Sequence, residues 1–309
     1  MPISRLTPLP ALLIDWVITA LWPLIGQWGL KHLSGIAFAQ AGLCIGLLAL
    51  APALARQGRW RRLFQPGIRG PLLGMGFFGS ALGTILLLSS LHYTTPGNAA
   101  IMAQSEVLYS ALLAAWLLGE SITRPQIAAS LLILGGTSLV MIDGLSTPRW
   151  KGDLLALLTP WIFQFGHVLA KRLPRDLDAC TLSGGRTFYG AVTLLPFFFW
   201  ELWRGASISL GGEVLLAIAA QGLLMNSINL VLWYIAIRQI DLSKATAMLL
   251  SYPALTLLLS WALGFERVGW AQWTGFALTF GGAFWLSRQV GSAPAGPARL
   301  PALPAPLVQ

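Results

Sequence analysis

The chain has 309 residues, of which 56% are hydrophobic and only 10% are charged. A soluble globular protein carries about 25% charged residues, so this composition excludes a water-soluble surface. The net charge of +9 comes from short basic segments between apolar stretches, and no nucleic-acid-binding module accompanies them, which argues against nucleic acid as a partner.

Apolar runs of about 20 residues, the length of a membrane-spanning helix, repeat along the chain. They predict an all-α polytopic membrane protein with ten transmembrane helices. The predicted spans are 11–31, 35–55, 70–91, 96–118, 123–142, 153–173, 181–203, 212–237, 243–264 and 268–289. Residues 1–10 are expected to form a cytoplasmic segment. The proline-rich residues 290–309 are expected to form a disordered cytoplasmic tail.

An internal duplication organises the sequence. The segment from Tyr93 to Asp143 recurs 146 positions later without a gap, so that Glu120 corresponds to Glu266. The pair Gly135-Gly136 corresponds in the same way to Gly281-Gly282, which composition bias does not readily produce. We therefore predict two five-helix repeats, at 11–142 and 153–289, joined by a loop at 143–152. Because five is odd, the second repeat enters the membrane from the opposite side, as in many secondary transporters.

The basic residues predict the orientation. If the N-terminus is cytoplasmic, most Lys and Arg lie inside, among them the cluster Arg56–Arg62. The outer set is then Lys31, Arg149, Lys151, Arg204 and Arg267. The positive-inside rule accordingly places both termini in the cytoplasm. Arg186 falls within a predicted span and does not enter this comparison.

Small residues predict close helix packing. Pairs at a four-residue spacing let helix backbones approach each other, and they are Gly42/Gly46, Gly70/Gly74 and Gly79/Gly83. Part of this stretch also matches G-x-G-x-x-G, but the match lies inside a membrane span and not between a strand and a helix. No metal-ligand spacing is present among the histidines. We therefore expect neither a cofactor nor a metal.

Several motifs resemble the drug/metabolite transporter superfamily, specifically its EamA-like members. They are the run from Tyr93 to Gly119-Glu120, its second copy ending Gly264-Phe265-Glu266, and the Gly-Gly pairs of the fifth and tenth spans. The resemblance covers residues 11–289. It implies a bacterial inner-membrane exporter of amino acids, other small metabolites or drugs, with ten helices and both termini inside. Aromatic amino acid exporters are the subgroup it suggests. The family pattern has Gly-Glu at both repeat positions, and Phe265 departs from it.

Glu106 is the sharpest candidate for a transport residue. Polar groups in the hydrocarbon region are costly and by default line a cavity or a path. Glu106 lies about ten residues into its span, about 15 Å at 1.5 Å per residue. Asn98 and Tyr109 share its helical face, and Tyr252 is its repeat partner. We expect Glu106 to bind a proton or a substrate amine. The alternative is a neutral carboxyl that is hydrogen-bonded between helices.

Further polar and aromatic residues share helical faces and are predicted to surround one cavity with Glu106. They are Trp16 and Gln27 in the first span, Trp161, Gln164 and His167 in the sixth, and Asn226, Asn229 and Trp233 in the eighth. Interhelical hydrogen bonding is the alternative for the polar members, and a satisfied histidine is favoured over a proton relay at His167.

Two other groups of residues have predicted mechanical roles. Pro23, Pro160 and Pro253 each remove a backbone hydrogen bond and are predicted hinges, with simple tolerance of proline as the alternative. Glu120 and Glu266 lie at span ends near Arg124 and Arg267. Capping or ion pairing is favoured there over substrate binding.

These features favour a secondary transporter of small amphipathic substrates, with a coupling proton as a candidate partner. The chain contains no G-x-x-x-x-G-K-[ST] motif, which argues against ATP hydrolysis. A lipid-handling protein such as a scramblase is the alternative. An intramembrane enzyme is disfavoured, because Asp15 is near a span end, the other aspartates are at loops, and no catalytic constellation forms. The sequence leaves the oligomeric state open.

Overall fold

The computed structural model describes residues 6–31, 33–91, 93–94, 102–140, 149–205, 211–262 and 269–290, and every regular element within them is a helix. Five of the described helices are long and apolar enough to cross a membrane. The chain is therefore a polytopic integral membrane protein, as its composition predicts. Asn98, Glu266, Arg267 and the predicted tail beyond Val290 lie outside the described residues.

The helices follow the predicted spans closely. The first half contains α1 (Pro8–Leu30), α2 (Gly35–Ala55), η2 (Arg56–Gly58), α3 (Arg59–Leu63), α4 (Arg69–Gly76), η3 (Phe77–Leu82), α5 (Gly83–Leu91), α7 (Glu106–Leu118) and α8 (Arg124–Val140). The second half contains α9 (Trp150–Arg172), α10 (Ala179–Trp203), α11 (Gly212–Ala220), η5 (Gln221–Asn229), α12 (Leu230–Ile237), α13 (Leu242–Leu249), α14 (Tyr252–Ala262) and α15 (Trp270–Val290).

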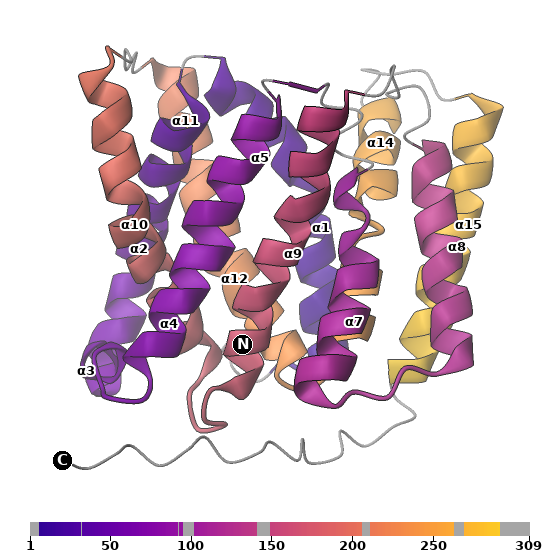
Figure 1. The fold of residues 1–309 in the computed structure, drawn as a ribbon, viewed down its shortest axis with the longest axis horizontal. Coiled ribbons are helices and arrows are strands. Elements are labelled where there is room, and N and C mark those ends of the chain that lie inside the picture. Colours follow the sequence, from indigo (N-terminus) through magenta and orange to yellow (C-terminus); the bar gives the residue numbers. More distant parts are fainter. Residues whose placement is uncertain are drawn as a thin grey trace.

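Two of the spans contain π-helical segments. In the first half α4, η3 and α5 form one continuous run, and in the second half α11, η5 and α12 form another. The two runs cross the bundle in opposite directions (Figure 1). A π-helical turn widens the helix locally and is frequent at functional sites.

Local signals explain where several helices begin and end. The Ser34 hydroxyl accepts a hydrogen bond from Ala37 N at 3.1 Å and starts α2. The Asp178 carboxylate accepts one from Thr181 N at 3.0 Å and starts α10. At the other end of a helix, Gly119 has a φ of 68°, which a residue with a side chain disfavours. Gly119 therefore ends α7 and leaves the following glutamate at the helix terminus.

Glycines let α8 and α15 pack backbone to backbone at one edge of the bundle (Figure 1). A Cβ added to Gly136 would lie 2.6 Å from Thr279 N and 2.7 Å from Gly275 O. A Cβ added to Gly282 would lie 3.0 Å from Ala129 O. In lipid, helix association depends on such close van der Waals contact, because no hydrophobic effect drives it.

The neighbouring glycines of the Gly135-Gly136 pair are expected to respond differently to substitution. Gly136→Ala places a methyl group against the α15 backbone, which cannot move aside cheaply, so we expect a loss of about 1–3 kcal/mol in unfolding free energy. Gly135→Ala is the matched control, because nothing lies within 4 Å of the added Cβ. Thermal unfolding midpoints in detergent measure both, and equal midpoints would contradict this account of the packing.

The other predicted glycine faces are used unequally. A Cβ on Gly46 would lie 2.6 Å from Asn226 Cβ, so α2 packs closely on η5. A Cβ on Gly79 would lie 3.0 Å from Arg186 Cζ. A Cβ on Gly74 would meet a Leu169 side chain, whereas Gly70 has nothing within 4 Å. The predicted face at Gly70 therefore makes no close helix contact.

The predicted span 243–264 is interrupted where a continuous helix was expected. α13 ends at Leu249, residues 250 and 251 form a turn, and α14 begins at Tyr252. Pro253 cannot donate a backbone hydrogen bond back into α13, which favours the break. The same turn nevertheless precedes Glu106 in the first half, 146 positions earlier, where no proline is present.

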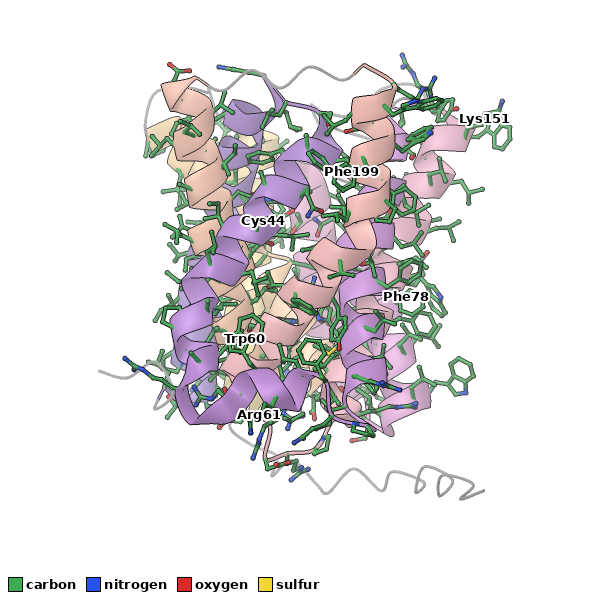
Figure 2. The ribbon with its side chains drawn as sticks, turned by 90° about the vertical axis from the view of Figure 1, so that its left-hand side faces the viewer. Cys44, Trp60, Arg61, Phe78, Lys151 and Phe199 are labelled. Carbon is green, nitrogen blue, oxygen red and sulfur yellow. The ribbon has the colours of Figure 1, made fainter. Side chains whose placement is uncertain are left out.

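Charged residues gather at the ends of the bundle, with Arg61 at one end and Lys151 at the other (Figure 2). The predicted basic cluster lies in η2 and α3. From it Arg59 pairs with Asp178 at 2.9 Å and Arg62 with Asp176 at 3.3 Å. Exposed ion pairs of this kind contribute about 0–1 kcal/mol to the unfolding free energy, so these two connect the loops and add little to the stability of the fold.

Candidate substrate-binding site in the bundle interior

Glu106 connects three helices in the interior. It is the first residue of α7, and its Oε1 accepts a hydrogen bond of 2.8 Å from Gln164 Nε2 of α9. The same nitrogen lies 3.5 Å from Thr246 Oγ1 of α13. Gln164 is fully buried, whereas Glu106 is partly exposed and so reaches accessible space. Both sequence-based interpretations of Glu106 remain open, because it is bonded between helices and also accessible.

Unmet hydrogen-bonding capacity surrounds this carboxyl. Gln164 Oε1 and Ser105 Oγ are buried and have no hydrogen-bond partner among the described residues. Buried polar atoms in native proteins are almost always partnered, by protein, water or ligand. Gln164, which donates to Glu106, thus keeps an acceptor atom without a partner among the described residues.

Arg186 brings a positive charge into the same interior. It lies in α10 and donates hydrogen bonds to Gly79 O at 2.5 Å, Ser80 Oγ at 3.3 Å and the Tyr234 hydroxyl at 3.3 Å. Gly79 in turn packs against α9, because a Cβ added to Gly166 would lie 3.3 Å from Gly79 Cα. A guanidinium has five N–H donors, so three bonds leave donors to spare. Arg186 is not among the predicted cavity residues, although an arginine in an apolar span is itself a signal of function.

His167 and Trp233 satisfy one another. Trp233 Nε1 donates to His167 Nδ1 at 2.9 Å, and the two side chains are 4% and 8% exposed respectively. The acceptor role of Nδ1 places the hydrogen of the neutral imidazole on Nε2. His167 is thus hydrogen-bonded, as the favoured interpretation expected, and Trp233 has its donor occupied.

The predicted polar face of the eighth span holds helices together. Asn229 Nδ2 donates to Thr19 Oγ1 at 2.8 Å and ties η5 to α1. The Asn226 carbonyl accepts from Thr187 Oγ1 at 3.1 Å. Trp16 packs edge-on against Phe280 of α15, with 5.9 Å between ring centroids. The side chain of Asn229 thus makes the interhelical hydrogen bond that was the alternative to cavity lining, whereas Asn226 is bonded through its backbone and Trp16 through ring packing.

Tyr109 and Trp161 form an aromatic contact between α7 and α9. Their ring centroids lie 5.2 Å apart in an edge-to-face arrangement. Tyr109 shares its helical stripe with Leu112 and Trp116, which are 55% and 71% exposed. Tyr109 lies one turn after Glu106 and Trp161 one turn before Gln164, so this contact and the Glu106–Gln164 bond join the same two helices.

The remaining predicted residues are placed as follows. Tyr252, the repeat partner of Glu106, begins α14 and is partly exposed. Pro160 lies within α9, which continues through it, and Pro253 follows the break before α14. The backbones of Pro23 and Gln27 belong to α1, and their side chains lie outside the described set. Within the described chain, no group of three His, Cys, Asp or Glu residues could hold a metal.

Glu120 clamps one end of the bundle. Its Oε1 lies 2.7 Å from Lys171 Nζ and accepts from Leu242 N at 2.8 Å, and its Oε2 accepts from Ser243 Oγ at 3.0 Å. The Glu120 and Lys171 side chains are only 7% and 16% exposed. The predicted capping and ion-pair role is confirmed. The ionic partner is Lys171 of α9, however, and not the sequence neighbour Arg124.

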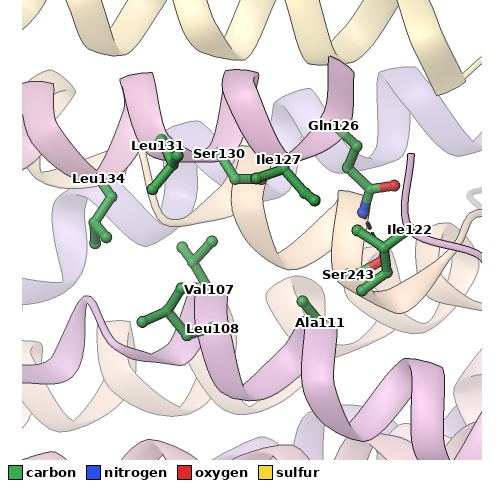
Figure 3. Close-up of a pocket in the computed structure, with 10 residues that line it drawn as sticks. All are labelled: Val107, Leu108, Ala111, Ile122, Gln126, Ile127, Ser130, Leu131, Leu134 and Ser243. Atoms are coloured by element: carbon green, nitrogen blue, oxygen red, sulfur yellow. Dashed lines mark hydrogen bonds between the residues drawn. The ribbon is translucent and has the colours of Figure 1, made fainter. Parts of the chain in front are cut away.

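An apolar groove lies between α7 and α8 (Figure 3). Val107, Leu108 and Ala111 of α7 face residues 127–134 of α8 across it, and Leu108 is 52% exposed. At one end the groove meets Gln126, whose Nε2 donates to Ser243 Oγ at 2.8 Å. None of the predicted cavity residues lines this groove.

Comparisons with known proteins agree with this membrane architecture. A protein of Archaeoglobus fulgidus named an uncharacterized transporter is 23% identical over 79% of this chain and 87% of its own. A protein of Streptantibioticus cattleyicolor named a probable terminal-alkyne amino-acid exporter is 25% identical over 83% of both chains. One solved crystal structure has the same fold, with a TM-score of 0.79 and 21% identity over 92% of this chain and 98% of that one.

The model of the EamA-like transporter family matches residues 7–142 and again residues 150–288. The two matches cover the helices of both halves, including Glu106, Gln164 and Arg186. A small-molecule substrate and a lipid environment follow from a transporter family of this kind. The chain belongs to the EamA-like transporter family.

Proposed function

We propose that the protein is a secondary exporter of amino acids and similar small amphipathic metabolites. The observation that carries this proposal is the pair of opposite charges in the interior, Glu106 and Arg186, beside buried polar atoms that lack partners. An amino acid carries an ammonium and a carboxylate on one carbon, and this site offers a group of opposite charge to each. The amino-acid exporter among the relatives supports the same class.

The proposed binding mode assigns one role to each group. The substrate ammonium donates to Glu106 and to the unpartnered Gln164 Oε1. The substrate carboxylate accepts from N–H groups of Arg186 that its three protein bonds leave over. Tyr252 borders the site. Asn229, His167 and Trp233 hold the surrounding helices in register, because their side-chain polar groups already bond across helix contacts.

Alternating access between two inverted five-helix repeats is the proposed mechanism. Three features support it. The π-helical runs of the two halves point in opposite directions (Figure 1). The turn before Glu106 and the turn before Tyr252 are 146 positions apart and share a backbone bond, Ser105 N to Met102 O in one and Ser251 N to Met248 O in the other. The glycine contacts of α8 and α15 also obey this offset.

We infer that both termini face the cytoplasm of a bacterial cell, in its inner membrane. Arg61 of the basic cluster and Lys151 lie at opposite ends of the bundle (Figure 2), which agrees with their assignment to the inner and the outer set of basic residues. Single cysteines in place of Gln65 and Lys151, with Cys44 and Cys180 replaced by serine, test this with an impermeant maleimide on intact cells. Labelling of the Gln65→Cys variant would reverse the assignment.

Reconstitution in liposomes tests the export function. Wild-type protein is expected to exchange labelled for unlabelled amino acid with saturation, above the rate of empty liposomes. Glu106→Gln is expected to weaken binding of substrates that carry an amine, because a neutral amide replaces the carboxylate. It should affect the deaminated acid far less, which makes that compound the internal control. No saturable exchange across all amino acid side-chain classes, with folded protein, would refute the substrate class.

A lipid-handling function is the second candidate, favoured by the apolar groove between α7 and α8. The groove is flanked by the exposed Leu108 and Leu131, and it could take an alkyl chain from the bilayer (Figure 3). Fluorescent lipids in the same liposomes distinguish the two functions. Lipid movement across the bilayer without amino acid exchange would favour this candidate.

A further inference from the structure

Asp15 is an interior acid that the proposed site does not use. It lies about two turns into α1 and is completely buried, and neither of its carboxylate oxygens has a hydrogen-bond partner among the described residues. Glu106, by contrast, accepts a hydrogen bond from Gln164. The sequence predicts Asp15 near a span end, and the structure buries its side chain completely within the bundle.

The packing of α1 shows how deep Asp15 lies. Near its start, Leu12 shares an apolar cluster with residues of α12 and α13, and further along Ile25 shares another with residues of α11; α1 contacts all three helices. α1 is therefore antiparallel to the α11–α12 run. Asn229 Nδ2 donates to Thr19 Oγ1 at 2.8 Å. Because the two helices are antiparallel, the residue one turn before Thr19 lies level with the residue one turn after Asn229. Asp15 is thus level with Trp233, the donor to His167.

The charged and titratable groups on the helices that pack against α1 have other partners or are exposed. Lys244 of α13 pairs with Asp241 at 2.9 Å, and Tyr234 of α12 bonds to Arg186. Tyr252 of α14 is partly exposed, and Arg238, which follows α12, donates to the carbonyl of Leu173. Glu213 of α11 and Cys44 of α2 are exposed, and η5 carries no ionisable side chain. No described cation pairs with Asp15.

We propose that Asp15 is the proton-binding site that couples transport to a pH gradient. This inference rests on the proposed export function. An isolated carboxylate in an apolar interior is strongly unfavourable, so Asp15 holds a proton in this conformation. The proton leaves when the alternative conformation brings water or a donor to the carboxylate. A metal cation would need several oxygen ligands, whereas Asp15 supplies only two and no described side-chain oxygen bonds to it.

A substitution separates coupling from transport. Asp15→Asn keeps the shape of the side chain and cannot ionise. We expect this variant to retain amino acid exchange at equal pH and to lose completely the accumulation that an imposed pH gradient drives. Asp176→Asn is the matched control, because Asp176 is exposed at the bundle end and both activities should persist. Accumulation by Asp15→Asn at the wild-type level would overturn the proposal.

An infrared titration of the wild-type protein tests the site even if Asp15→Asn fails to fold. Carboxyl-labelled aspartate identifies the bands, and the other aspartates lie at or beyond the ends of the predicted spans. We expect a protonated aspartic acid band at neutral pH that disappears in alkali and changes on addition of substrate. Absence of that band, or a band that no pH removes, would overturn the proposal.

The two tests also separate this inference from the export function. If wild-type protein exchanges no amino acid, the proposed substrate class fails, and the infrared titration by pH alone still decides whether Asp15 exchanges a proton. If wild-type protein exchanges amino acids and Asp15→Asn still accumulates them on a pH gradient, only the assignment of Asp15 fails.

Discussion

Replacing Glu120 with alanine is expected to lower the unfolding free energy by about 3–5 kcal/mol, because the change leaves the largely buried Lys171 ammonium without its partner. The carboxylate also accepts the backbone N–H of Leu242 at 2.8 Å, so the first turn of α13 loses its cap. One residue thus joins the ends of α7, α9 and α13. Thermal or denaturant unfolding in detergent measures the loss.

A matched control separates this clamp from ordinary surface charge. Arg62→Ala breaks the pair with Asp176, whose side chains are 41% and 69% exposed, and we expect a change of about 0–1 kcal/mol. A further variant, Lys171→Met with Glu120→Gln, removes both charges and should recover part of the loss, because no unpaired charge remains. Equal stability of Glu120→Ala and Arg62→Ala would contradict the clamp.

Replacing Arg186 with methionine is expected to weaken amino acid binding by about 2–5 kcal/mol, which is more than tenfold. The substitution removes the proposed partner of the substrate carboxylate. It also leaves Gly79 O and the Tyr234 hydroxyl without their donor. The half-saturation concentration for exchange and the thermal shift produced by amino acid both report the loss.

The matched ligand for this prediction is the amino acid amide, which keeps the ammonium and lacks the carboxylate. We expect the amide to bind wild-type and Arg186→Met protein about equally. Tyr234→Phe, which removes one hydroxyl and keeps the arginine, should reduce binding far less. If Arg186→Met lost amino acid and amide affinity to the same extent, the residue would be a structural support and not a carboxylate ligand.

The sequence alone predicted the membrane class, the family and most helix bounds, because long apolar runs and repeated motifs are local properties of a chain. It also identified Glu106 and Gln164, since polar residues stand out within apolar spans. It could not show that these two side chains bond to each other. Their hydrogen bond joins residues 58 positions apart, and that neighbourhood exists only after α7 and α9 pack.

Only the tertiary structure decided which polar residue does what. Glu120 was assigned to its sequence neighbour Arg124, but packing of α9 brings Lys171 to it. The sequence did not indicate which residues Arg186 would bond to, because Gly79 and Tyr234 belong to two other spans. Asp15 lies near a predicted span end, and only the packing of the surrounding helices shows that its side chain is completely buried. Burial and hydrogen bonding depend on what the neighbouring helices bring, and hydropathy along one chain does not carry that information.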